Sequence, residues 1–271
     1  MDFLQLRYHL QEHHRFLRVS IQQAQISYIL CPEVMAVIIF LRLFPSTTQR
    51  SINIKEIRNH NRVMTGKFIT VEGIEGAGKT TCMDSMKELL ASYNIGYIST
   101  REPGGTLLAE KIRDLLLNVD DDPPVALTEL LLIFAARGQH IQKVILPALS
   151  DGLWVLCDRF TDATFAYQGG GRGLKTELIS QLELMTQKGL SPDLTILLDI
   201  SPNLGLARAK KRGNLDRFEE EELQFFNNVR RAYLNLAKSN RERYITIDAS
   251  SSEEKVAKII KETLAHRFLS Q

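Results

Sequence analysis

The chain has 271 residues, of which 44% are hydrophobic and 24% charged, so its composition is that of a folded globular protein and excludes wholesale disorder. The formal net charge is only +2, which argues against a protein that binds nucleic acid through bulk charge. The three cysteines are too few, and odd in number, for a disulfide framework. A reducing, cytoplasmic compartment is therefore expected.

The first 63 residues differ in charge from the rest of the chain. They hold eight Lys or Arg against four Asp or Glu, which leaves 26 basic and 28 acidic residues after them. Their one long apolar run, at 34–44, is about half of the roughly 20 residues that cross a bilayer, so we expect no membrane partner. We expect residues 1–63 to be a poorly ordered extension without catalytic function. An alternative is a tail that binds an anionic partner.

Residues 64–271 are expected to form one α/β domain. Five short runs rich in Ile, Val and Leu do not alternate with polar residues, as is typical of strands covered on both faces. These predicted strands are 68–72, 96–100, 153–157, 194–199 and 244–247.

Apolar residues between the strands recur at helical spacing. The predicted buried faces are Met83/Met86/Leu90, Leu108/Ile112/Leu115 and Val256/Ile259/Ile260/Leu264. Ser251 and Glu254 have the spacing of a capping box before the last of these. Alternating strands and helices predict a parallel sheet with helices on both faces.

A phosphate-binding loop follows the first predicted strand. Residues 73–80 read G-I-E-G-A-G-K-T and match G-x-x-x-x-G-K-[ST] at every defined position. Glycines let backbone N–H groups turn toward phosphate oxygens at the start of a helix. Lys79 would supply charge to the outer phosphates, and the Thr80 hydroxyl can bind Mg²⁺.

Three arginines are expected at the same edge of the sheet. Arg101 and Arg159 follow two predicted strands, and Arg137 lies in a helical segment between them. Arginine binds two oxygens of a phosphate monoester at once, so the group predicts a second anion site. Because an acceptor phosphate is already ionised at neutral pH, transfer to it needs positioning and charge rather than a general base. The pattern predicts a nucleoside monophosphate kinase.

Five segments resemble the thymidylate kinase family and occur in that family's order: VEGIEGAGKTT, TREPGGT, FAARGQH, DRF followed by AYQGGGRG, and RGNLDRFE. The resemblance covers 64–271. It implies the P-loop nucleoside monophosphate kinase fold, with a five-stranded sheet in the order 2-3-1-4-5. It also implies a homodimer that phosphorylates dTMP to dTDP with ATP and Mg²⁺.

The resemblance assigns roles to residues of the phosphate-binding loop and the strand ends. It places the ATP phosphates on Gly73, Ile74, Glu75, Gly76, Ala77, Gly78, Lys79, Thr80 and Thr81. Thr80 and Asp158 would hold the metal, and Lys79 and Arg159 would be catalytic.

The resemblance also implies a dTMP site made of Glu75, Arg101, Arg137, Asp158, Arg159, Thr164, Tyr167 and Gln168. Within it, Arg101 and Arg159 would bind the phosphate, and Arg137 would donate to a thymine carbonyl. Thr164 and Gln168 would line the base. Glu75 would face the sugar, and Tyr167 would pack on the deoxyribose.

Ile133 departs from the family pattern. Similar enzymes commonly stack thymine on a Phe at this position, whereas here Phe134 follows one residue later. Neighbouring residues of a helix point about 100° apart, so Phe134 need not substitute. Thymine would then rest on an aliphatic surface, and a kinase for another pyrimidine nucleotide stays open as an alternative.

The basic segment 208–217 is expected to be a lid over ATP. The resemblance implies either an arginine in the phosphate-binding loop or arginines in a lid, and this loop has no arginine, so the charge of the transition state must be met from elsewhere. Arg212 and Arg217 are the predicted contributors. The remaining alternative, a P-loop ATPase that acts as a switch, would not require the three acceptor arginines.

Met64 opens a stretch that is typical of the start of a compact enzyme, and we hypothesise that translation begins there. We expect the intact mass of the native protein to correspond to a chain starting at Met64. An intact mass that includes Met1 would contradict this hypothesis.

Overall fold

The computed structural model describes residues 66–118, 122–211, 217–219 and 221–269. The chain divides into two units, 1–62 and 63–271, and the predicted extension lies outside the described residues. No helix within the described ranges is long and apolar enough to cross a membrane.

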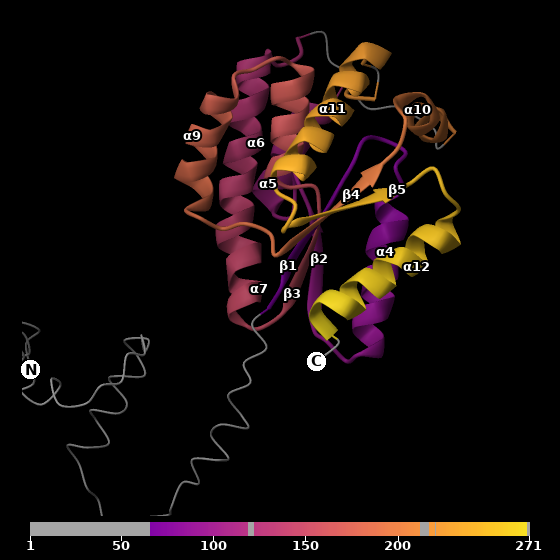
Figure 1. Cartoon of the computed structure of the whole chain (residues 1–271). Coiled ribbons are helices and arrows are strands. Elements are labelled where there is room, and N and C mark those ends of the chain that lie inside the picture. Colours follow the sequence, from indigo (N-terminus) through magenta and orange to yellow (C-terminus); the bar gives the residue numbers. More distant parts are fainter. Residues whose placement is uncertain (1–65, 119–121, 212–216, 220, 270–271) are drawn as a thin grey trace, which may run out of the picture. The chain divides into compact units, whose positions relative to one another are not determined.

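A five-stranded parallel sheet forms the centre of the described domain (Figure 1). Its order is β2-β3-β1-β4-β5, so the predicted strand order is confirmed. The strands are β1 (Phe68–Glu72), β2 (Tyr97–Arg101), β3 (Trp154–Asp158), β4 (Leu194–Asp199) and β5 (Tyr244–Asp248). Every residue of β1 is buried, because helices cover both faces of the sheet at its centre.

Helices α4 and α12 pack together on one side of the sheet, and α6, α9 and α11 lie on the other (Figure 1). The predicted covering of both faces is therefore confirmed. The α-helices are α4 (Lys79–Ser92), α5 (Leu107–Leu117), α6 (Ala126–His140), α7 (Leu146–Ser150), α8 (Thr161–Thr164), α9 (Thr176–Gln187), α10 (Pro202–Lys210), α11 (Leu223–Ser239) and α12 (Glu253–Leu264). Three π-helical segments are η1 (Ile141–Ile145), η2 (Phe165–Gly171) and η3 (Ala265–Leu269).

Strands β2 and β3 begin and end one residue later than predicted. Pairing between them continues to their last residues, where Arg101 lies opposite Asp158. Arg101 and Asp158, which were predicted to follow their strands, are thus part of the sheet. A rigid, hydrogen-bonded backbone holds their side chains at its edge.

Helix α5 buries a different face from the predicted one. Ala109, Ile112 and Leu116 are buried, whereas Leu108 and Leu115 are 51% and 59% exposed. The helix has apolar residues on several sides, so periodicity alone could not select the stripe that meets α6.

The predicted capping box of α12 is also wrong. The side chain of Ser252, not Ser251, accepts the hydrogen bond at the helix start, and its donor is the N–H of Lys255. Either serine can cap a helix, so the spacing of the sequence alone did not identify the residue that caps α12.

Candidate active site

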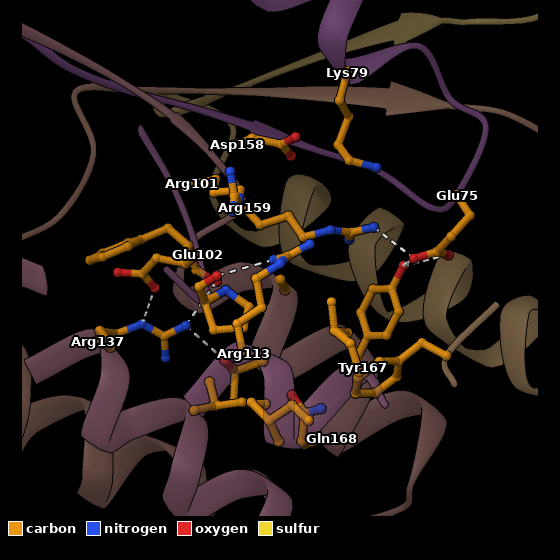
Figure 2. A pocket seen from close by; sticks show the side chains of 18 of the residues that line it. Glu75, Lys79, Arg101, Glu102, Arg113, Arg137, Asp158, Arg159, Tyr167 and Gln168 are labelled. Carbon is orange, nitrogen blue, oxygen red and sulfur yellow. Dashed lines mark hydrogen bonds and ion pairs between the residues drawn. The ribbon is translucent and has the colours of Figure 1, made fainter. Parts of the chain in front are cut away.

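A cleft of about 250 Å³ lies at the carboxyl ends of β1, β2 and β3 (Figure 2). Such edges of parallel sheets are where α/β proteins bind ligands. The cleft brings together predicted site residues from six helices and strands and from two loops: Glu75, Lys79, Arg101, Arg137, Asp158, Arg159, Thr164, Tyr167 and Gln168. Lys79 and Asp158 lie at one end of the view in Figure 2, and Arg137 and Gln168 at the other.

The phosphate-binding loop connects β1 to α4, which begins at Lys79. Gly76 has a φ of +69°, and a Cβ there would collide with the carbonyl oxygen of Gly205. Only glycine satisfies both conditions. The loop is therefore shaped by close backbone contact with α10, and it ends at the start of α4, where helix N–H groups can bind a phosphate.

Lys79 is held inside the loop by backbone carbonyl groups. Its Nζ donates to the oxygens of Gly73 and Ile74, at 3.2 and 3.1 Å. Burial and the neighbouring charge of Arg159 lower the pKa of Lys79 to about 8, against the opposing effect of nearby carboxylates. A phosphate group at this position would restore the balance of charge.

The residues predicted to hold Mg²⁺ fit that ion. The Oδ1 atom of Asp158 is buried and has no hydrogen-bond partner in the described part of the chain. Thr80 is exposed at the start of α4. The described residues contain no cluster of three His, Cys, Asp or Glu side chains that could hold a metal alone. Magnesium commonly binds one carboxylate together with substrate phosphates and water, which matches this set.

Glu75, Arg159 and Tyr167 form a cluster in the middle of the cleft (Figure 2). Arg159 donates to Glu75 at 2.8 Å, and its guanidinium lies 4.8 Å from the centre of the Tyr167 ring. The Tyr167 hydroxyl donates to Glu75 at 2.7 Å. Burial raises the pKa of Tyr167 well above its ordinary value, so the hydroxyl remains a donor.

The backbone that presents Arg159 is held by a buried carboxylate. Arg159 has a φ of +68°, a left-handed conformation that is costly for a side chain with a Cβ. Glu72, at the end of β1, accepts from the next N–H, that of Phe160, and from the Tyr233 hydroxyl, both at 2.7 Å. Burial raises the pKa of Glu72. These contacts hold the strained turn in place.

Two further arginines line the cleft near the end of β2. Arg101 is half-exposed and forms an ion pair with Glu110 at 2.7 Å. Arg113, on α5, donates to the carbonyl oxygen of Pro103 at 3.1 Å. Sequence reasoning missed Arg113, whose only signal is a basic residue about two turns into the helix that follows the TREPGGT loop.

Arg137 is almost wholly buried at the far end of the cleft. Its Nε donates to Glu102 at 2.6 Å, and its Nη2 donates to Thr164 at 3.0 Å and to the oxygen of Phe160. Its Nη1 is buried and has no partner in the described part of the chain. A ligand oxygen that enters the cleft could supply this missing acceptor.

The positions of Ile133 and Phe134 agree with the sequence expectation. Ile133 lines the cleft, and Phe134 is buried with its ring centre 4.8 Å from the Arg137 guanidinium. The aromatic ring therefore packs against the Arg137 guanidinium, and an aliphatic side chain faces the cleft.

Gln168 and Arg217 meet at a second buried carboxylate, Glu129 of α6. Gln168 Nε2 lies 2.8 Å from one carboxylate oxygen, and Arg217 Nη2 lies 2.5 Å from the other. Arg217 also donates to the oxygen of Leu116. Its predicted role over ATP stays a prediction, and Arg212 lies outside the described residues. Sequence reasoning assigned no role to Glu129, which carries no motif signal, or to Glu102, although Glu102 lies within the TREPGGT segment.

Comparison with known proteins gives one consistent result. Residues 71–260 match the family model described as thymidylate kinase. A thymidylate kinase from Ectopseudomonas mendocina is 57% identical over 70% of this chain and 90% of the relative, and one from Hahella chejuensis is 50% identical over 75% and 98%. The crystal structure of thymidylate kinase from Ehrlichia chaffeensis superposes with a TM-score of 0.61 at 33% identity, covering 73% of this chain and 98% of that one.

The lowered pKa of Lys79 predicts a pH dependence of phosphate binding. Below pH 8 the ammonium group is charged and attracts phosphate, and above pH 8 it loses its proton. The association constant for Mg-ATP should therefore fall about tenfold between pH 7 and pH 9, as measured by calorimetry. Lys79→Arg keeps its charge throughout this range, so its weaker binding should be independent of pH. A flat profile for the unaltered protein would contradict the assignment.

Proposed function

The chain belongs to the thymidylate kinase family and phosphorylates dTMP to dTDP, and from that premise we propose how its residues share the work. The observation that carries the proposal is one continuous cleft with the phosphate-binding lysine at one end and the partnerless Arg137 Nη1 at the other. A donor and an acceptor nucleotide would meet between these ends, around Arg159.

The phosphate donor in this proposal is ATP with Mg²⁺. The loop from Gly73 to Thr81 would cradle its phosphates through backbone N–H groups, and Lys79 would neutralise the outer ones. Asp158 and Thr80 would hold Mg²⁺, supported by the partnerless Oδ1 atom of Asp158. The bound ion would neutralise charge on the transferred phosphoryl group.

The acceptor in the proposal is dTMP, with its phosphate toward Arg101 and Arg159 and its base toward Arg137. Glu75 and Tyr167 would lie along the deoxyribose, since both line the middle of the cleft. Thr164, Gln168 and Ile133 would surround the base. A phosphate monoester oxygen is already a nucleophile at neutral pH, so these residues position and neutralise rather than remove a proton.

Arg159 is the proposed catalytic arginine of the described cleft. It comes from the strained turn after β3, and its partners Glu75 and Tyr167 both line the acceptor site. An acceptor phosphate would compete with Glu75 for its guanidinium, which would bring the charge to the reacting oxygens. Arg212 and Arg217 remain the proposed lid contributors.

A homodimer and a cytoplasmic location complete the proposal. Helices α5 and α6 pack together and expose leucines at 108, 115, 127 and 131, each 49–59% accessible. Exposed apolar side chains on adjacent helices are typical of a surface that a second subunit covers. Cys82 and Cys157 are free thiols, which suits a reducing compartment.

We expect ADP formation from Mg-ATP to be stimulated far more by dTMP than by dUMP, dCMP, AMP or dGMP. Arg159→Ala should lower kcat for dTMP at least 100-fold, because charge at the transferred phosphoryl group is lost. Arg231→Ala removes an exposed arginine that bonds Asn228, and it should leave kcat within twofold. If no monophosphate raised turnover above the rate with ATP alone, the kinase function itself would be refuted.

The proposed dimer surface is testable by light scattering. The unaltered protein should have twice the mass of one chain, and the double variant Leu115→Arg/Leu131→Arg should have the mass of one, because buried charges would oppose association. Leu184→Arg, on the exposed face of α9, should stay dimeric. Dissociation by the control but not by the double variant would place the interface elsewhere.

A further inference from the structure

The chemistry of the Gln168 side chain does not decide whether it donates a hydrogen bond to a ligand or accepts one. A glutamine amide can turn either its NH₂ group or its oxygen toward a ligand. An amide that reads a base therefore discriminates between bases only if something else decides its orientation. In this protein the deciding group is Glu129, which is wholly buried on α6.

The Glu129 side chain acts only as a hydrogen-bond acceptor among the described residues. One oxygen lies 2.8 Å from Gln168 Nε2 and 3.4 Å from Arg172 Nε, and the other lies 2.5 Å from Arg217 Nη2 and 3.4 Å from Arg172 Nη2. Two guanidinium groups can only donate, so the carboxylate they share can only accept. The NH₂ group of Gln168 is thereby committed to Glu129.

The oxygen of Gln168 is then the amide atom left for the cleft. No hydrogen bond to this oxygen is formed by any residue of the described ranges, and Gln168 lines the cleft. The end of the cleft proposed to bind the base thus offers one acceptor, the Gln168 oxygen. The bond between Glu129 and the NH₂ group determines that this atom, and not the NH₂ group, faces the ligand.

Glu102 plays the matching role for Arg137. It accepts from Arg137 Nε at 2.6 Å, and its other oxygen accepts from His140 Nδ1 at 2.8 Å. His140 is itself held by Thr100 at 2.7 Å. With Nη2 bonded to Thr164 and a carbonyl group, the guanidinium can present only Nη1 to the cleft.

We propose that Glu102 and Glu129 are positioning residues that fix one donor and one acceptor at the base edge of the cleft, and so select a 4-oxo pyrimidine over a 4-amino pyrimidine. The inference rests on the proposed acceptor site and deepens it. A thymine or uracil edge offers an oxygen at position 4 and an N–H at position 3, which complement Arg137 and Gln168. A cytosine edge offers an NH₂ group and a bare nitrogen, so both contacts would be mismatched.

The matched pair of substrates is dTMP and 5-methyl-dCMP, which share the methyl group and differ only at this edge. Because two polar groups of the site would be left unpaired, the unaltered enzyme should prefer dTMP by at least 1,000-fold in kcat/KM. The amide introduced by Glu129→Gln can both donate and accept, so the Gln168 amide would be free to rotate by about 180° and exchange its oxygen and NH₂ group. The preference should then fall at least tenfold.

Glu221→Gln is the matched control. Glu221 forms an ion pair with Arg172 in the same cluster, whereas the Gln168 amide bonds Glu129 and not Glu221. The control removes the same charge from the same cluster, and the preference should stay within twofold of the unaltered enzyme. An equal loss in both variants would show a general electrostatic effect and overturn the inference.

A second pair of variants, made in the Gln168→Leu enzyme, separates a positioning role of Glu129 from a purely structural one. In Gln168→Leu the amide is absent, so adding Glu129→Gln should not change the preference further. The inference is overturned if the addition lowers the preference as much as it does in the unaltered background. It is also overturned if folded Glu129→Gln keeps the full preference.

Glu102→Gln provides an independent measurement if the Glu129 variant does not fold, as judged by thermal unfolding. Its looser hold on Arg137 should lower the same preference, and a folded variant with the full preference would overturn the inference. Failure of the proposed function looks different, because the unaltered protein would then not use dTMP. An enzyme that prefers dTMP but is insensitive to both glutamate changes would refute this inference alone.

Discussion

Buried guanidinium groups impose the constraint on which this site depends. Arg137 is only 2% exposed, and a charge so far from water is tolerable only with a carboxylate at hydrogen-bond distance. Glu102 meets that demand for Arg137, and Glu129 meets it for Arg172 and Arg217. The pair of Arg137 and Glu102 leaves the Nη1 atom of Arg137 without a partner among the described residues, and Arg137 lines the cleft. We propose that recognition of the base follows from how these buried charges are neutralised.

The parallel sheet brings these groups to one place. Residues at the ends of β1, β2 and β3 are far apart in the chain, yet Glu72, Arg101 and Asp158 end adjacent strands of one sheet. The central strands are buried on both faces, so their ends move little relative to one another. Strain in the turn at Arg159 is sustained because Glu72 holds the next N–H. The rigid sheet and the strained turn therefore both hold these side chains in place at the edge of the cleft.

The fold and the chemistry-bearing motifs were largely predictable from local pattern. Unbroken apolar runs predict buried strands, and glycines at fixed spacing predict the phosphate-binding loop. Predictions failed where two choices fitted the pattern equally well: which face of α5 is buried, at Leu108, and which serine caps α12, at Ser251. Contact with a neighbouring element chose between them there, and no local pattern contains that contact.

The sequence alone determined the family, the phosphate-binding loop and the arginines at the carboxyl edge of the sheet, because backbone geometry and phosphate chemistry restrict the residues at those positions. Only the tertiary structure decided which carboxylate pairs with which arginine. Glu102 lies in the TREPGGT segment and Glu129 in no motif, but neither position reveals its partner until packing buries the two beside Arg137 and Gln168. Burial converts an ordinary charge into a constraint, since an unpaired group cannot then be rescued by water.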